Sequence, residues 1–228
     1  MAGTIRIGLL FGNKQIRDGR RMLLGTQRDF DIVYEGSDGL AAIDELLNYS
    51  LDVILVDNRL QNLSGLQTIQ RFLRRHSDGL TRLPGFVLTG PFGSPEMELQ
   101  AIRAGAIGTV TEEDSAQAVI DRVRRAGQTR ESIDTEYVNR VFANQGILSG
   151  SNQRWLLRLV DLPADEQRVL DAIGSGISFD EISNSTGLSI KRVNETLGSM
   201  QRRLGLATRH QLYLALYEAG VIKPLVGS

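Results

Sequence analysis

Few side chains in this sequence are placed to do chemistry, and three of them come at the ends of apolar segments. Asp57 ends one such segment, Thr89 ends the next, and Glu112 follows a third. A carboxylate can bind a divalent cation or act as a nucleophile, and a hydroxyl beside it can donate a hydrogen bond. These residue types predict a polar crevice, provided that the three segments bring them to one edge of the fold.

The composition removes most other chemistry. The 228 residues include no cysteine and only two histidines, His76 and His210. Disulfides, thiolate catalysis and cysteine-bound zinc are therefore excluded. A metal site or catalytic triad based on histidine is unsupported, since only two histidines are present and they lie in different segments. We expect a protein that is not an enzyme and has no metal and no cofactor.

No segment approaches the roughly 18 apolar residues of a membrane span, and the first residues lack the charged start and apolar core of a signal peptide. We therefore expect a cytoplasmic protein with no membrane contact. The formal net charge of −1 argues against nonspecific coating of nucleic acid. It is compatible with site-specific binding through a local basic patch.

Apolar segments and amphipathic helices alternate five times in the first 126 residues. The expected strands are 5–11, 32–34, 53–56, 86–88 and 107–110, and the expected helices are 16–24, 40–47, 64–73, 96–104 and 114–126. This order predicts an α/β fold with a doubly wound, five-stranded parallel sheet, whose ligands gather at the carboxyl ends of the strands.

Over about residues 4–126 the chain resembles the receiver domain of two-component response regulators. Asp57 stands where that family has its phosphoacceptor, and Thr89 matches the hydroxyl that follows phosphorylation. The resemblance implies phosphorylation by a histidine kinase with Mg²⁺.

Departures from the family pattern argue against that chemistry. Phe11 and Gly12 replace the two adjacent carboxylates that hold Mg²⁺, and Glu112 replaces the lysine. A single carboxylate should bind Mg²⁺ poorly, and an acid would repel phosphate. Gln61 also replaces a proline. The prediction is a vestigial phosphoacceptor pocket, made of Asp57, Thr89, Phe11, Gly12 and Glu112, with no histidine kinase as partner.

In such a pocket Asp57 needs another role. We expect its carboxylate to be satisfied by backbone amides or by Lys14, with Arg59 as a further candidate. The alternative is that the pocket binds a small molecule in place of phosphate and metal, so that the protein is a regulator gated by that molecule.

The segment from Gly176 to Leu206 reads as two short helices that meet at a tight turn. Gly187 is suited to end the first helix and Ser189 to cap the second. In the second helix, apolar residues recur at helical spacing and predict one inward face: Val193, Leu197, Met200 and Leu204. The outward residues are mostly polar and basic.

With its flanking helices this segment resembles the LuxR-type (NarL/FixJ) helix-turn-helix domain, over about residues 161–222. The resemblance implies double-stranded DNA as partner and a DNA-binding set of eight residues: Lys191, Arg192, Asn194, Glu195, Gly198, Arg202, Arg203 and Arg209. Residues 161–228 hold seven Lys or Arg against eight Asp or Glu, a net charge of −1. Phosphate attraction must therefore come from the local cluster on one helix.

Glu195 has two readings, either a simple ion pair with Lys191 one turn away or acceptance of a hydrogen bond from cytosine N4. Two family positions that are usually basic are Asn194 and Asp180 here, and these losses leave open a protein-interaction adaptor with weak or no DNA binding.

The expected domains are a receiver-like domain at 1–126, a linker with a helical segment at 127–160, and a helix-turn-helix domain at 161–228. Two-fold DNA sites suit a symmetric dimer, so we expect a homodimer paired through the helix at 208–219. The apolar residues of that helix could instead pack only within the monomer. The leading hypothesis is a transcription regulator that works without aspartyl phosphorylation.

Overall fold

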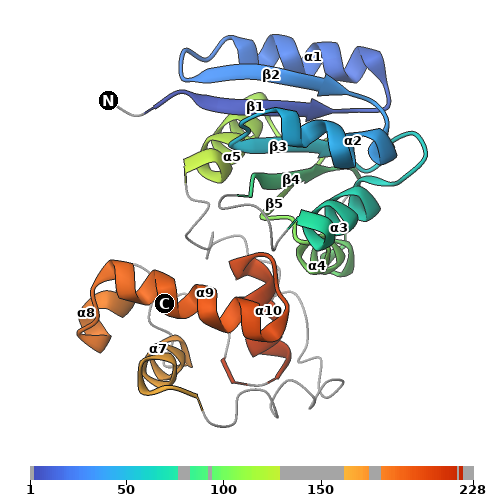
Figure 1. The fold of residues 1–228 in the computed structure, drawn as a ribbon. Helices are drawn as coiled ribbons and strands as arrows, with labels where there is room; N and C mark the ends of the chain where they lie inside the picture. The colour runs from blue at the N-terminus through green and yellow to red at the C-terminus, as the bar shows by residue number, and fades with distance from the viewer. Residues whose placement is uncertain are drawn as a thin grey trace. The chain divides into compact units, whose positions relative to one another are not determined.

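The chain folds into two compact units, Met1–Arg130 and Glu131–Ser228. The computed structural model describes residues 3–76, 83–91, 94–128, 162–174, 181–219 and 221–222. The expected linker at 127–160 lies almost entirely outside these residues. Each unit is described by itself (Figure 1).

The first unit is built on a five-stranded parallel sheet, as the alternating pattern predicts. Its strands follow the order β2-β1-β3-β4-β5 (Figure 1). They are β1 (Ile5–Leu10), β2 (Phe30–Gly36), β3 (Val53–Asp57), β4 (Gly85–Thr89) and β5 (Gly108–Val110). Every residue of β3 and β4 is buried, as expected for strands covered on both faces.

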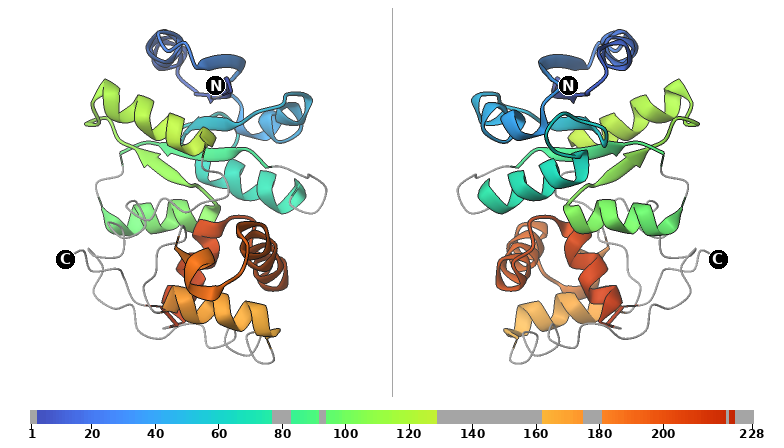
Figure 2. Two further views of the ribbon diagram at one scale, coloured as in Figure 1. Left: turned by 90° about the vertical axis from the view of Figure 1, so that its left-hand side faces the viewer. Right: turned by 90° about the vertical axis from the view of Figure 1, so that its right-hand side faces the viewer.

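Helices cover both faces of this sheet. They are α1 (Lys14–Gly25), α2 (Gly39–Glu45) with the short 3₁₀ turn η1 (Leu46–Asn48), α3 (Gly65–His76), α4 (Pro95–Ala104) and α5 (Ala116–Gln128). Helices α1 and α5 pack on one face, and α2 and α3 on the other (Figure 2). Helix α5 begins two residues later than expected, because the Asp114 carboxylate accepts the Thr111 N–H at 2.7 Å and forms a turn there.

The described helices of the second unit confirm the two-helix pattern. They are α7 (Ala164–Gly174), α8 (Ile182–Thr186), α9 (Ile190–Leu204) and α10 (Arg209–Glu218). Gly187 ends α8 at φ 68°, and the Ser189 hydroxyl caps α9 by accepting the Arg192 N–H. The first turn expected near Phe179 lies outside the described residues.

The inward face of α9 is buried as predicted. Its four apolar residues are all at most 4% exposed, and α9 contacts α7, α8 and α10. On α10, Leu212 and Leu216 are also buried, so these two side chains lie inside the monomer. None of the helices in the described part of the chain is long and apolar enough to cross a membrane.

Candidate functional site

The fold brings Asp57 and Thr89 together at the carboxyl edge of the sheet. The two residues are partners in the β3–β4 register, and the N–H of Asn58 donates to the Thr89 carbonyl at 2.8 Å. Asp57 is 3% exposed and Thr89 6% exposed. The strand register therefore places a buried aspartate next to a buried threonine at this edge of the sheet.

Arg59 joins the two acids of this crevice. Its backbone N–H donates to Asp57 Oδ1 at 3.0 Å, and its guanidinium lies 4.0 Å from the same oxygen. The Nη2 atom of Arg59 lies 2.9 Å from Glu112 Oε1. Of the expected partners, a backbone amide and the Arg59 guanidinium contact Asp57, as predicted. Lys14 was the wrong candidate, because its ammonium pairs with Asp18 one turn along α1 at 2.6 Å.

The two positions before α1 are closed to metal ligands. Phe11 is 1% exposed and belongs to the apolar core. At Gly12, a Cβ atom would overlap the carbonyl oxygen of Arg59 and stand 3.4 Å from Leu60 Cα. A carboxylate at position 12 would therefore require the loop after β3 to move.

That loop is fixed by bonds to the segment between β2 and α2. The N–H of Gln61 donates to the Ser37 carbonyl at 3.1 Å, and the Gly39 N–H donates to the Gln61 carbonyl at 3.0 Å. A proline at position 61 would have no N–H for the first bond. Asn62, at φ 62°, donates its side-chain amide to Asp38 at 2.5 Å. These bonds hold the Arg59 carbonyl against Gly12.

The electrostatics of the crevice disfavour additional negative charge. Burial raises the pKa of Asp57 above its ordinary value, against the opposing effects of the Arg59 hydrogen bond and charge. Glu112 raises this pKa further, and Arg20 lowers it. Burial in turn lowers the pKa of Arg20, which faces Asp57 and Asp114. The described residues contain no group of three or more side chains suited to hold a metal ion.

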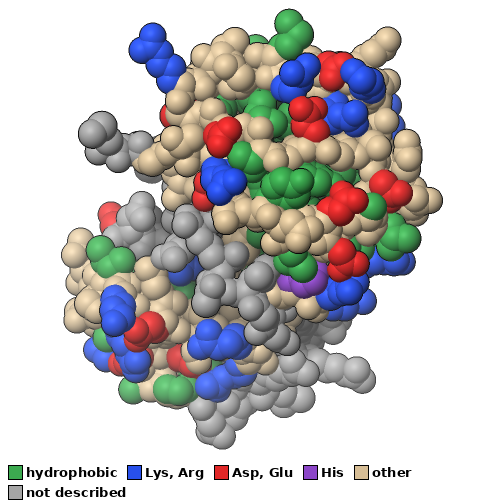
Figure 3. Space-filling view, turned by 45° about the horizontal axis from the view of Figure 1, so that its top comes forward, with side chains coloured by type: hydrophobic (Ala, Val, Ile, Leu, Met, Phe, Trp, Pro, Cys, Tyr) green, Lys and Arg blue, Asp and Glu red, His purple; other side chains and the backbone are tan. Residues whose placement is uncertain are grey.

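The predicted DNA-binding residues lie on α9, except Arg209 at the start of α10. Lys191, Arg192, Glu195, Arg202 and Arg203 are exposed, whereas Asn194, Gly198 and Arg209 are partly buried. Within the second unit, basic and acidic side chains lie next to one another (Figure 3). The helix thus carries its cations among acids.

Two acids of α7 hold two of these arginines. Arg192 Nε lies 2.6 Å from Asp165 Oδ2, and Arg203 Nη2 lies 3.3 Å from Oε2 of Glu166, a residue only 4% exposed. Hydrogen bonds from Arg192 and then Arg168 lower the pKa of Asp165. Neither acid was predicted from the sequence, because contacts between side chains 27 and 37 residues apart leave no periodic signal.

The remaining polar contacts are weaker or absent. Glu195 lies 3.9 Å from Lys191 and 3.5 Å from Arg192, so the predicted ion pair exists but is long. Arg209 donates to Asn194 Oδ1 at 3.0 Å. Within the described part of the chain, Arg202 makes no ion pair.

The sheet, the carboxyl-edge crevice and the helix-turn-helix define a class of protein. Residues 12–124 match the family described as response regulator receiver domain. The chain is a response regulator of the LuxR/NarL type, and relatives of that kind match it along most of its length.

Two relatives illustrate the match. The transcriptional regulatory protein LiaR of Bacillus subtilis is 24% identical over 207 residues, which cover 91% of this chain and 94% of LiaR. The nitrate/nitrite response regulator protein NarP of Escherichia coli is 27% identical over 194 residues, which cover 85% of this chain and 86% of NarP.

Solved structures support the fold. The RcsB response regulator of Salmonella typhimurium has a TM-score of 0.51 at 18% identity, covering 93% of this chain and 99% of RcsB. The receiver domain of the putative regulator NarL from Mycobacterium tuberculosis has a TM-score of 0.50 at 22% identity, covering 57% of this chain and all of that domain.

Proposed function

We propose that this response regulator is a DNA-binding transcription regulator that acts without aspartyl phosphorylation. Residues 1–126 form the degenerate receiver, 127–160 the linker and 161–228 the DNA-binding domain. The protein has no enzymatic activity of its own in this proposal. The observation that carries it is the ion-pair bridge in which Arg59 joins Asp57 to Glu112.

The bridge argues against phosphoryl transfer on physical grounds. Transfer to a carboxylate needs a divalent cation and a positive side chain to neutralise the charge on the phosphoryl oxygens. Here Glu112 takes the place expected for that side chain, and its partner Arg59 is already engaged. Position 12 has no room for a metal ligand. A histidine kinase is therefore not part of the proposal.

DNA binding is supported by the outward face of α9. A helix of this kind fits the major groove, where side chains near its N-terminus reach base edges and more distal arginines contact phosphates. Arg202 makes no ion pair within the described residues, so it can turn to a phosphate at little cost. LiaR carries the name transcriptional regulatory protein.

A homodimer completes the proposal. Two-fold symmetric dimers suit DNA sites made of two half-sites. One solved structure with the same fold contains two RcsB dimers bound to two parallel DNAs, at 17% identity and a TM-score of 0.50. Because Leu212 and Leu216 are buried in the monomer, pairing through α10 would use its remaining surface. Light scattering of the purified chain gives its mass directly, and a monomer at the concentrations used for DNA binding contradicts this part.

Phosphorylation is tested by incubation with acetyl phosphate and Mg²⁺, followed by intact-mass measurement. We expect no adduct on the wild type. The change Glu112→Lys is the comparison, since it restores the family's positive side chain at an exposed position and leaves the core and the Gly12 contact unchanged. A wild-type adduct of one phosphate that disappears in Asp57→Ala overturns phosphorylation independence.

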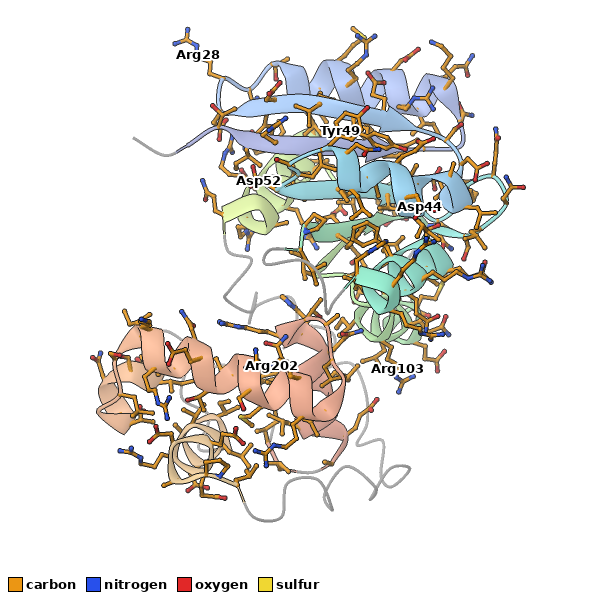
Figure 4. All side chains as sticks on the ribbon, viewed as in Figure 1. Arg28, Asp44, Tyr49, Asp52, Arg103 and Arg202 are labelled. Atoms are coloured by element: carbon orange, nitrogen blue, oxygen red, sulfur yellow. The ribbon has the colours of Figure 1, made fainter. Side chains whose placement is uncertain are left out.

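DNA binding is tested by sequencing genomic fragments that co-purify with the full chain, followed by gel shifts on the enriched sites. The variant Arg192→Ala plus Arg202→Ala should lose most of the binding. Arg28→Ala plus Arg71→Ala, on the first unit, removes the same charge from exposed positions and should bind like wild type (Figure 4 labels Arg28 and Arg202). Equal binding by all three proteins rejects α9 as the DNA face. No enriched fragment at low salt, together with a stable protein partner in pull-down, favours the adaptor.

A further inference from the structure

Ile190, the first residue of α9, is exposed without a reason inside its own domain. Its exposed fraction is 70%. Within the described part of the second unit it is the only large hydrophobic residue that is exposed. The cap of α9 is supplied by Ser189, so Ile190 is not needed to start the helix. A β-branched residue also has no advantage in helix propensity there.

Its place on the helix connects it to the proposed DNA face. Residues four apart on a helix are neighbours, so one row along α9 contains Ile190, Asn194, Gly198 and Arg202. Three of these four residues belong to the predicted DNA-binding set. Lys191, with a side chain that is 87% exposed, directly follows Ile190. The apolar side chain thus stands among cations that suit a polyanion.

One apolar group in the major groove fits such a side chain. Thymine carries its C5-methyl there, whereas the other base edges present hydrogen-bond donors and acceptors. Residues at the N-terminus of a recognition helix are those that reach base edges. We propose that Ile190 is a specificity-determining residue that packs against a thymine methyl group. This inference rests on the proposed DNA-binding function and names one base that it selects.

Contact with a thymine methyl group gives the exposed Ile190 side chain a role in recognition. Covering a methyl group with Ile190 removes apolar surface from water on both partners, and this gain arises only on the correct site. The surrounding cations attract any DNA sequence, because phosphate contacts carry no sequence information. Ile190 then supplies discrimination that the cations do not.

The test begins with selection of bound sequences from a random DNA pool by the full-length protein. Each thymine of the selected site is then replaced in turn by uracil, which removes only the C5-methyl. Affinities are measured for wild type, Ile190→Val and Ile190→Ala. Met22→Ala is the matched control, since Met22 is 72% exposed on the first unit. Thermal melts check that Ile190→Ala folds like wild type, as its exposure implies.

We expect uracil at one position per half-site to weaken the wild type about three- to fourfold, the factor that follows from burying one methyl group. The same replacement should leave Ile190→Ala unchanged, leave Ile190→Val intermediate, and weaken Met22→Ala as much as wild type. Equal uracil losses in wild type and Ile190→Ala, or a selected site whose affinity depends on no thymine methyl, overturn the inference and leave DNA binding standing. Failure to select any sequence overturns the proposed function as well.

Discussion

The backbone carbonyl oxygen of Arg59 occupies the space in which a side chain at Gly12 would begin. This contact closes the position from which a receiver would offer a metal ligand. The loop that carries Arg59 is in turn fixed through Gln61 to the Ser37 carbonyl and the Gly39 N–H. Position 12 therefore lacks a carboxylate, and the Arg59 carbonyl oxygen occupies the space that such a side chain would need.

The first prediction concerns that contact. Gly12→Ala should lower the free energy of unfolding by about 1–3 kcal/mol, the usual cost of forcing atoms into an occupied space. Gly19→Ala is the control, because nothing lies within 4 Å of a Cβ atom there, in the middle of α1. It should raise stability by about 0.5–1 kcal/mol, as expected for glycine replaced in a helix. Urea unfolding gives the free energy of unfolding of both variants. Changes of the same sign in the two variants would contradict the close contact between position 12 and the Arg59 carbonyl.

The second prediction follows from the buried carboxylate of Asp57. Its pKa is raised in the folded protein, mainly by burial, so the folded state binds this proton more tightly than the unfolded chain. The stabilisation from the protonated form is complete below the unfolded pKa and is lost as the pH rises through the folded pKa. At neutral pH the ionised group is therefore a net cost.

Asp57→Asn should accordingly raise the melting temperature at pH 7, and the gain should shrink as the pH is lowered towards the ordinary value of 3.8. The new side chain keeps an oxygen that can accept the Arg59 N–H. Asp31→Asn, at an exposed position of β2, is the control and should change little. A gain that grows on acidification would show that the pKa of Asp57 is lowered rather than raised.

The fold could be predicted from the sequence because it depends on periodicity and caps. The uninterrupted apolar run Val53 to Val56 became a strand that is buried on both faces, and Gly187 and Ser189 ended α8 and began α9 as predicted. The inward residues of α9 were also predicted correctly, since helical spacing alone determines which side chains share a face.

The contacts inside the candidate sites were harder to predict. Arg59 was one candidate partner of Asp57, but its simultaneous contact with Glu112 joins residues 53 positions apart. The predicted contact between Lys14 and Asp57 was wrong, because a nearer acid, Asp18, lies one turn away from Lys14 on the same helix. The Asp165–Arg192 pair depends on how α7 packs on α9, which no local pattern encodes. Side-chain pairing between elements thus requires the tertiary structure.

The third prediction concerns the ion pair between Asp165 of α7 and Arg192 of the proposed DNA-binding face. Asp165 holds Arg192 at 2.6 Å and also contacts Arg168. In Asp165→Asn, Arg192 should become available to a phosphate, so affinity at low salt should rise several-fold and the salt dependence should steepen by about one counterion. The cost in folding stability should be small, because water screens an ion pair whose arginine is largely exposed.

Asp171→Asn removes the same charge from an exposed position on α7 and serves as the control. It should change neither the affinity nor the salt slope to the same degree. Weaker binding by Asp165→Asn than by wild type would mean that Asp165 orients Arg192 for contact with DNA rather than competing for it.

The last prediction separates folding from recognition at Gly198. A Cβ atom there would approach only Arg202 Nη1, at an ordinary 3.5 Å, so the domain itself does not require glycine. Gly198→Ala should raise the free energy of unfolding by about 0.5–1 kcal/mol. If the helix lies against base edges at this point, the added methyl should weaken DNA binding roughly tenfold through steric overlap. Gly187→Ala, at φ 68°, should instead destabilise the domain. Thermal melts and gel shifts on one selected site give both quantities, and a Gly198→Ala variant that is more stable and binds DNA as tightly as wild type would place this part of α9 away from the DNA.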